Sequence, residues 1–237
     1  GGVGAGNGDF SGQVYTVDRP TVLSIVRASG DNTAASIVSY TVTFSEPVYG
    51  VDLADFALVQ SGGVSGATLR SISGSGAVRT VSVNTGAGIG TLGLNLVDNN
   101  TIVDYTNNPL GGVGAGNGNF TGQVYTIDRL RVLSINRVNV SPTVAASVSY
   151  TVTFSKPVYG VNLADFTLVL SGVNGATVTS ITGTGAVRTV VVNTGTGNGT
   201  LQLNLVDDNT IVDYSNNPLG GVGAGNGDFS GQVYTVD

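Results

Sequence analysis

Apolar and polar residues alternate one by one along several short stretches of the chain. From Val38 to Ser45, the even positions hold Val, Tyr, Val and Phe, and the odd positions hold Ser or Thr. Leu92, Leu94 and Leu96 form a second such stretch, and both patterns recur at 148–155 and 201–205. A period of two places one set of side chains on each face of a strand, so these stretches predict half-buried β-strands.

Two further stretches extend the strand prediction. In Val22–Arg27 we expect Leu23 and Ile25 to face the core, because Val26 is replaced by Asn in the second copy of the pattern, which marks its face as solvated. Ala77–Asn84 and 186–193 predict another pair of strands. No stretch has a sustained 3.6-residue period, and only 53–56 and 101–105 are expected to form single helical turns.

An internal repeat organises the whole sequence. The octapeptide GGVGAGNG begins at Gly1, Gly111 and Gly220, so the repeat measures 110 and then 109 residues. Each repeat is too long for one coil of a solenoid and has the size of an autonomous domain. About seven short strands with Gly and Asn turns in each repeat predict an all-β chain of tandem β-sandwiches.

The chain holds two repeats and 18 additional residues, which leaves the phase of the repeat open. Residues 220–237 match residues 1–18 almost letter for letter. We prefer the phase in which this segment closes a unit, so residues 1–18 are the closing strand of a preceding unit and a possible donor strand. The domains are then 19–128 and 129–237. The chain begins with Gly1-Gly2 and shows no signal peptide, so we expect a processed or excised piece of a longer protein.

Three motifs of the repeat resemble those of a known family. The segments TFSEPVYGVDLADF, LVDNNTIVDYTNNPLGG and GNGDFSGQVYTVD are similar to the bacterial Ig-like tandem repeats of large extracellular surface and adhesin-type proteins. The resemblance implies a Greek-key, Ig-like sandwich, a place outside the cell, and calcium near domain junctions. The linker Asp128-Arg129-Leu130 is shorter than that family's usual junction, which argues against free hinge motion between the units.

Composition and charge exclude several classes of function. The chain has no Cys, His, Met or Trp, so no thiol nucleophile, no Ser-His-Asp triad and no ordinary zinc site can form. A net charge of -6 disfavours nucleic acid and anionic membrane as partners. No apolar run approaches the length that membrane insertion needs, about 20 residues. Asp98 and Asp104 could pair as glycosidase carboxylates, but no other catalytic group accompanies them, and we expect no enzyme activity.

Clusters of Asp and Asn make calcium the one cofactor that the residues suggest. Carboxylate and amide oxygens are the ligands that calcium takes, although the spacing is not that of an EF-hand. The alternative is that these side chains cap turns through their own backbone. The candidate ligands in the two repeats are Asp98, Asn100 and Asp104, and Asp207, Asn209 and Asp213.

Other repeated polar residues have structural interpretations. Asp55 and Asp165 are expected to be N-caps of a short turn. Asp52 corresponds to Asn162, an exchange that suits a cap or a hydrogen bond better than an obligatory charge. The repeated arginine of the AVRTV segments is expected on a solvated strand face, and a carboxylate partner or a contact with the next domain is the alternative.

These observations favour a structural protein whose partners are other copies of itself. We expect a segment of an extracellular bacterial filament or surface stalk, polymerising head-to-tail by addition of the leftover strand to a neighbour's sheet. The alternative is a calcium-dependent adhesin module that binds glycan or a host or cell-surface protein. Its candidate aromatic contacts are Tyr49, Tyr105, Tyr159 and Tyr214.

Overall fold

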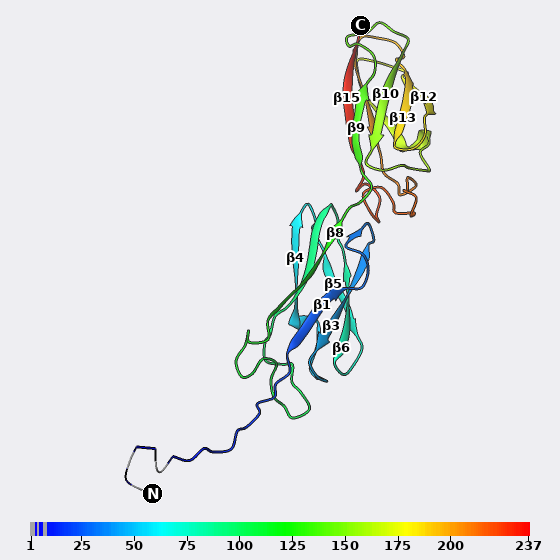
Figure 1. Cartoon of the computed structure of the whole chain (residues 1–237). Helices are drawn as coiled ribbons and strands as arrows, with labels where there is room; N and C mark the ends of the chain where they lie inside the picture. Colours follow the sequence, from blue (N-terminus) through cyan, green and yellow to red (C-terminus); the bar gives the residue numbers. More distant parts are fainter. Residues whose placement is uncertain (1–2, 4, 7–8) are drawn as a thin grey trace.

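The chain folds into two β-sandwiches that follow one another along a long axis (Figure 1). The computed structural model describes residues 3, 5–6 and 9–237. The strands of the first sandwich are β1 (Val22–Arg27), β2 (Asn32–Thr33), β3 (Ile37–Phe44), β4 (Phe56–Gly62), β5 (Thr68–Ser73), β6 (Val78–Asn84), β7 (Gly90–Leu96) and β8 (Phe120–Ile127). Those of the second are β9 (Val132–Arg137), β10 (Ser147–Phe154), β11 (Phe166–Ser171), β12 (Thr177–Thr182), β13 (Val187–Asn193), β14 (Gly199–Leu205) and β15 (Phe229–Val236).

The strand order is that of an Ig-like sandwich. In the first unit one sheet has the order β1-β3-β6-β5, and the other has the order β2-β8-β7-β4, with β2 parallel to β8. The second unit repeats this with β9-β10-β13-β12 facing β11-β14-β15. Apart from the two-residue strand β2, each unit thus has the four strands against three that define constant-type Ig domains with Greek-key connections. The all-β, tandem Ig-like prediction is therefore confirmed.

Each sandwich has a hydrophobic core of its own. The inward positions of the alternating stretches, such as Tyr40, Val42 and Leu94, are fully buried, as the period of two predicted. A tyrosine from the closing strand crosses between the sheets: Tyr125 of β8 lies edge-on to Tyr40 with ring centroids 5.2 Å apart. Its hydroxyl donates to the carbonyl of Ser39 at 2.9 Å, and Tyr234 repeats these contacts in the second core. The closing strand thus completes both the sheet and the core.

Two local predictions were wrong, and one was confirmed. Leu23 is 59% exposed, because a β-bulge between Val22 and Ser24 shifts the register of β1, so that Val22 and Ile25, not Leu23, lie on the core side. Residues 101–105 form an isolated bridge and a turn rather than a helical turn. A 3₁₀ turn does form at η1 (Leu53–Asp55) and again at η2 (Leu163–Asp165), in keeping with the prediction for 53–56.

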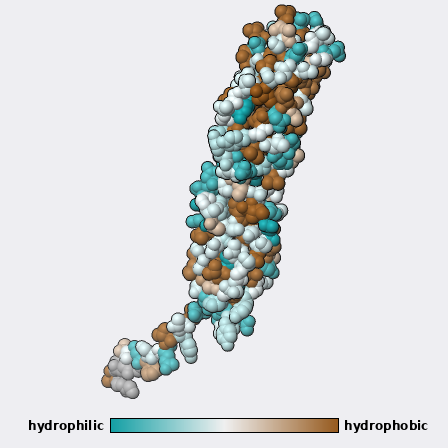
Figure 2. Space-filling model, turned by 90° about the vertical axis from the view of Figure 1, so that its right-hand side faces the viewer, coloured by the Kyte–Doolittle hydropathy of each residue, from teal (hydrophilic) through white to brown (hydrophobic). Residues whose placement is uncertain are grey.

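The segment before the first sandwich is extended and exposed. Residues 9–18 form no strand, and they run away from the sheets toward the N-terminus (Figure 1). Phe10 is 94% exposed and Tyr15 is 88% exposed. In Figure 2 this segment projects from the end of the first sandwich without cover. No helix within the described residues is long and apolar enough to cross a membrane.

A glycine inside each closing strand makes room for the opposite sheet. A Cβ on Gly122 would lie 2.6 Å from Cγ2 of Ile25 and 2.3 Å from the carbonyl oxygen of Leu94, and a Cβ on Gly231 would meet equivalent atoms. Gly12, at the same position of the exposed segment, has nothing within 4 Å of its Cβ position. Glycine is therefore required at this position in β8 and β15, where the strand packs in a sandwich, but not in the exposed segment.

We expect Gly122→Ala to destabilise the first sandwich by roughly 1–3 kcal/mol, because the added methyl overpacks the contact with β1. Gly12→Ala is the matched control and should leave the denaturation midpoint of the chain unchanged. Urea denaturation of both variants measures the difference. Equal midpoints for the two variants would contradict the packing argument.

Candidate functional site at the joint between the sandwiches

The two sandwiches meet at a joint formed around a four-residue linker. Asp128–Arg131 connects the end of β8 to the start of β9. The first sandwich contributes the β6–β7 turn (Thr85–Ile89), and the second contributes the β10–β11 connection and the β14–β15 loop (206–228). Figure 1 shows the β14–β15 loop lying at the end of the second sandwich that faces the first.

Arg129 is buried in this joint with 2% of its surface exposed. Its guanidinium donates to Oγ1 of Thr85 at 2.6 Å, to the carbonyl of Gly86 at 2.8 Å and to the carbonyl of Gly88. The other side of the arginine rests on Gly221, where a Cβ would lie 2.8 Å from Nε. Burial lowers the pKa of Arg129, but arginine remains protonated, so its charge is balanced by these oxygen dipoles.

We name Arg129 and its three acceptors in the β6–β7 turn the arginine latch. It joins a side chain of the linker to the far end of the preceding sandwich. The backbone carbonyl of the next residue, Leu130, accepts from the N–H of Gly220 at 2.9 Å, which ties the linker to the second sandwich as well. With both sides held, the linker has little freedom to act as a hinge.

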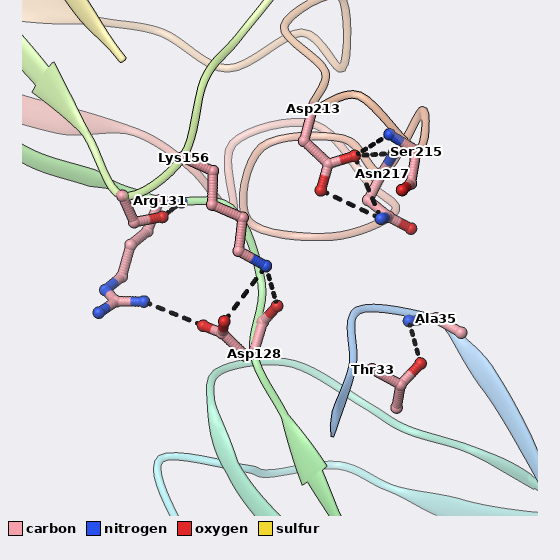
Figure 3. A network of polar contacts seen from close by, with 9 residues as sticks. Thr33, Ala35, Asp128, Arg131, Lys156, Asp213, Ser215 and Asn217 are labelled. Atoms are coloured by element: carbon pink, nitrogen blue, oxygen red, sulfur yellow. Dashed lines mark hydrogen bonds and ion pairs between the residues drawn. The ribbon is translucent and has the colours of Figure 1, made fainter. Parts of the chain in front are cut away.

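Ion pairs around Asp128 add to the joint (Figure 3). The Lys156 ammonium lies 3.2 Å from Oδ2 of Asp128 and donates to its backbone carbonyl at 2.7 Å. Arg131 approaches Oδ1 of the same carboxylate at 3.4 Å. Between 30% and 43% of each of these side chains is exposed, so solvent screens the pairs and their contribution is modest beside the buried latch.

The first repeat carries the parts of the same joint at its N-terminal end, with one change of charge. Asp18, Arg19 and Pro20 correspond to Asp128, Arg129 and Leu130. Glu46 stands where Lys156 stands in the second repeat, and its pKa is raised by burial and by the nearby carboxylate of Asp18. The salt bridge of the internal joint is thus replaced by two acids.

Asp98 and Asn100, predicted calcium ligands, hold the β7–β8 loop (97–119) to the glycine-rich motif. The Asp98 carboxylate accepts from the backbone N–H groups of Asn100 at 3.0 Å and Gly118 at 3.1 Å. Oδ1 of Asn100 accepts from the N–H of Gly114 at 3.1 Å. Asp207 and Asn209 make the same bonds in the second repeat. Burial raises the pKa of Asp207, and the neighbouring Asp228 and Asp208 raise it further.

Asp104 and Asp213, the other two acidic candidates, organise a separate turn. Oδ1 of Asp213 accepts from the N–H groups of Ser215 at 2.8 Å and Asn217 at 3.0 Å. Burial by itself would raise the pKa of Asp213, but the bonds from Asn217 and Ser215 lower it below its usual value. The described residues contain no group of three or more acidic side chains arranged to hold a metal. Calcium binding stays a prediction, which calorimetric titration with calcium tests.

The predicted N-cap at Asp55 was wrong by three residues. Asp52 is the N-cap of η1, and its carboxylate accepts from the N–H of Ala54 at 2.7 Å. Asp55 is the buried N3 partner of a capping box: its Oδ2 accepts from the N–H of Asp52 at 2.7 Å. Burial raises the pKa of Asp55. Asn162 and Asp165 repeat the arrangement, so the cap role inferred from the exchange of Asp52 for Asn162 is confirmed.

The predicted solvated arginine of the AVRTV strands was also wrong. Arg79 is only 8% exposed, and its guanidinium donates to the carbonyls of Val48 at 2.7 Å and Gly76 at 2.9 Å. Arg188 makes the equivalent bonds in the second sandwich. These arginines fasten loops within one unit, whereas the contact between units is made by Arg129. The sequence did point to Arg129, because the dipeptide Asp-Arg follows the closing-strand sequence at both 18–19 and 128–129.

The lowered pKa of Asp213 gives a pH-dependent contribution to stability. The ionised carboxylate is favoured in the folded state, so its contribution is present above about pH 4, the unfolded value, and is lost as the pH falls through the lower folded pKa. We therefore expect Asp213→Asn to lower the melting temperature at pH 7, with a difference from the wild type that narrows as the pH falls below about 4.

Asp237→Asn is the matched control, because Asp237 is exposed and its side chain has no hydrogen bond within the described residues. Thermal denaturation of the three proteins at pH 3, 5 and 7 measures the effect. A difference between Asp213→Asn and the wild type that is the same at all three pH values would contradict the assignment.

Comparison with known proteins gives similarities of fold. No protein-family model matches the chain, and no curated protein sequence matches it. The N-terminal part of the bacterial S-layer protein SbsC is similar over 92% of this chain and 44% of its own, with 16% identity and a TM-score of 0.32. The D0-D1 domain of intimin covers 77% of this chain and 89% of its own, with 13% identity and a TM-score of 0.25.

The Yersinia pseudotuberculosis adhesin InvE covers 90% of this chain and 58% of its own, with 14% identity and a TM-score of 0.28. The chain therefore spans less than half of the SbsC structure and somewhat more than half of InvE. SbsC is a bacterial S-layer protein and InvE is an adhesin, and at such identities and TM-scores the likeness transfers no function to this chain.

Proposed function

We propose that this chain is a structural segment of an extracellular bacterial filament or surface stalk, in which Ig-like units succeed one another as stiff spacers. The observation that carries the proposal is the arginine latch. A buried guanidinium with three oxygen acceptors on the preceding unit fixes the angle between units, which a spacer that must hold its length requires.

The repetition of the joint supports the same function. Arg19 rests on Gly112 as Arg129 rests on Gly221, so the parts of a joint occur at the start of both units. The two units are also nearly identical in sequence, as suits a spacer, whereas a binding tip is expected to depart from its stalk. Other copies of the same unit are the proposed partners, added head-to-tail by a β-strand, and the cell surface is the proposed location.

A second candidate is an adhesin module, favoured by exposed aromatic residues. Tyr159 and Tyr214 pack edge-to-face with ring centroids 4.9 Å apart, while 52% and 70% of their surfaces remain exposed. Tyr49 and Tyr105 are exposed at the same positions of the first unit. Tyrosines of this kind anchor protein and glycan contacts. Loss of binding to cells by Tyr159→Ala and Tyr214→Ala variants would favour this alternative.

We expect Arg129→Ala to convert the stiff joint into a flexible one, because it removes hydrogen bonds to a charged group that contribute roughly 1.5–3 kcal/mol each. Small-angle X-ray scattering should give a broader distribution of the distance between the two units. Arg19→Ala is the matched control, since Arg19 has the same glycine behind it but no hydrogen-bond acceptor for its guanidinium within the described residues. Equal distributions for the wild type and Arg129→Ala would contradict the stiff spacer.

A further inference from the structure

The exposed N-terminal segment has the sequence of a strand that is buried elsewhere in the same chain. Residues 10–17 read FSGQVYTV, which is also the sequence of β15. In β15, Tyr234 is fully buried and Val236 is 6% exposed, whereas their counterparts Tyr15 and Val17 are 88% and 69% exposed. The segment therefore carries the apolar face of a closing strand with no core beneath it.

The place of β15 can accept a replacement without threading the chain. β15 is the edge strand of its three-stranded sheet and the last strand of the second sandwich, and among the described residues it pairs with β14 and, through one bridge, with Thr143. The contacts that β15 makes with the core depend on its tyrosine. The hydroxyl of Tyr234 donates to the carbonyl of Ser149 at 2.9 Å, and the ring lies 5.1 Å from that of Tyr150.

The far end of the second sandwich also offers the acceptor half of an arginine latch. The β13–β14 turn (Thr194–Asn198) corresponds to the β6–β7 turn of the first sandwich. Gly195 has a φ of 71° and Gly197 a φ of 89°, close to the 67° and 75° of their counterparts Gly86 and Gly88. Thr194 is anchored to Ala145 as Thr85 is anchored to Ala35, with Oγ1–O distances of 2.8 Å in both.

The arginine that corresponds to Arg129 for this turn is Arg19, near the N-terminus. Arg19 rests on Gly112, and its guanidinium has no hydrogen-bond partner within the part of the chain that the structure describes. Only Asp18 separates it from the exposed strand sequence, as Asp128 separates Arg129 from β8. A strand placed in the position of β15 therefore delivers Arg19 to the β13–β14 turn with the spacing that the internal joint uses.

We infer that residues 10–17 of one copy take the place of β15 in a second copy, and that Arg19 then latches onto Thr194, Gly195 and Gly197 of that copy. This inference rests on the proposed function and names the strand and the turn through which the units join. The contact is heterologous, since it joins the head of one chain to the tail of the next, and it leaves both kinds of end open for further copies. Such contacts give filaments.

The strand itself favours neither the single chain nor the assembly, so the contacts of the new joint determine how far assembly proceeds. Each event buries one FSGQVYTV segment and releases an identical one. The tethered β15 competes with an effective concentration in about the millimolar range, so we expect assembly of the wild type near that concentration. The new joint places Asp18 beside Glu46 where the internal joint has the Asp128–Lys156 pair. Glu46→Lys should therefore promote assembly.

Weakening β15 in its own chain should favour the incoming strand. Tyr234→Ala removes the core tyrosine of β15 while Tyr15 of the next copy remains intact, and loss of a buried aromatic side chain corresponds to a preference of about a hundredfold or more. We expect Tyr234→Ala to assemble at about a hundredfold lower concentration than the wild type, measured by analytical ultracentrifugation and electron microscopy.

Gly12→Ala supplies the matched control within the Tyr234→Ala background. Gly12 touches nothing in the single chain, but at the position of Gly231 an added Cβ would lie 2.7 Å from Ile135 Cγ2. The double variant should therefore lose assembly although the substitution leaves the single chain unaffected. Arg19→Ala should weaken assembly through the latch. Assembly that is indifferent to Gly12→Ala would overturn the exchange.

Cysteine pairs in this cysteine-free chain test the register directly and do not depend on the stability of Tyr234→Ala. Thr200 lies opposite Thr235, and both are exposed. Oxidised Thr200→Cys/Thr235→Cys locks β15 in place and should stay monomeric, while the reduced form assembles. Thr16→Cys/Thr200→Cys should give a ladder of disulfide-linked chains.

The outcomes separate this inference from the proposed function. Equal assembly of the locked and reduced proteins overturns strand exchange, as does a chain that stays monomeric in every variant up to the millimolar range. Either result leaves the stiff spacer untouched, because that proposal is tested within one chain by Arg129→Ala. A broadened distance distribution is expected there whether or not chains exchange strands.

Discussion

Each sandwich depends on a closing strand that returns across a long loop to complete the second sheet. β8 and β15 bring a tyrosine between the sheets, where it lies against the tyrosine of β3 or β10 and donates its hydroxyl to that strand's neighbouring carbonyl. A glycine in the same strand admits the opposite sheet. Without this strand, β7 or β14 would lose a pairing partner and the core would lose one of its two buried tyrosine rings.

The position of the closing strand also determines where units can be joined. The closing strand is the last strand of each unit and ends where the next unit begins. In the first sandwich, the linker that follows β8 therefore emerges beside the β6–β7 turn. A single arginine two residues later can then reach that turn, while the carbonyl of the following residue, Leu130, is bonded to the next sandwich. The stiffness of the joint is thus a consequence of strand order and linker length together.

The polar loops serve the same architecture. Asp98 and Asp207 bind the backbone of the glycine-rich motif. Asp104 and Asp213 each organise a turn, and the turn of Asp213 lies beside the joint. These side chains form charge-assisted hydrogen bonds to backbone N–H groups, which orders a loop that has few apolar residues to pack. The repeated loop is therefore held by its own acidic and amide side chains in both units.

The sequence by itself determined the features that depend on local order and on repetition. Alternation placed Tyr40 and Leu94 in the core, the repeat predicted two sandwiches, and the exchange of Asp52 for Asn162 indicated a cap, because each of these follows from spacing along the chain. The tertiary structure decided the burial of Arg79 and Arg129, the exposure of Leu23 and the separate turns formed by Asp98 and Asp104. The physical reason is that a bulge, a carbonyl acceptor 41 residues away or a neighbouring sandwich leaves no local period in the sequence, and only packing brings these groups together.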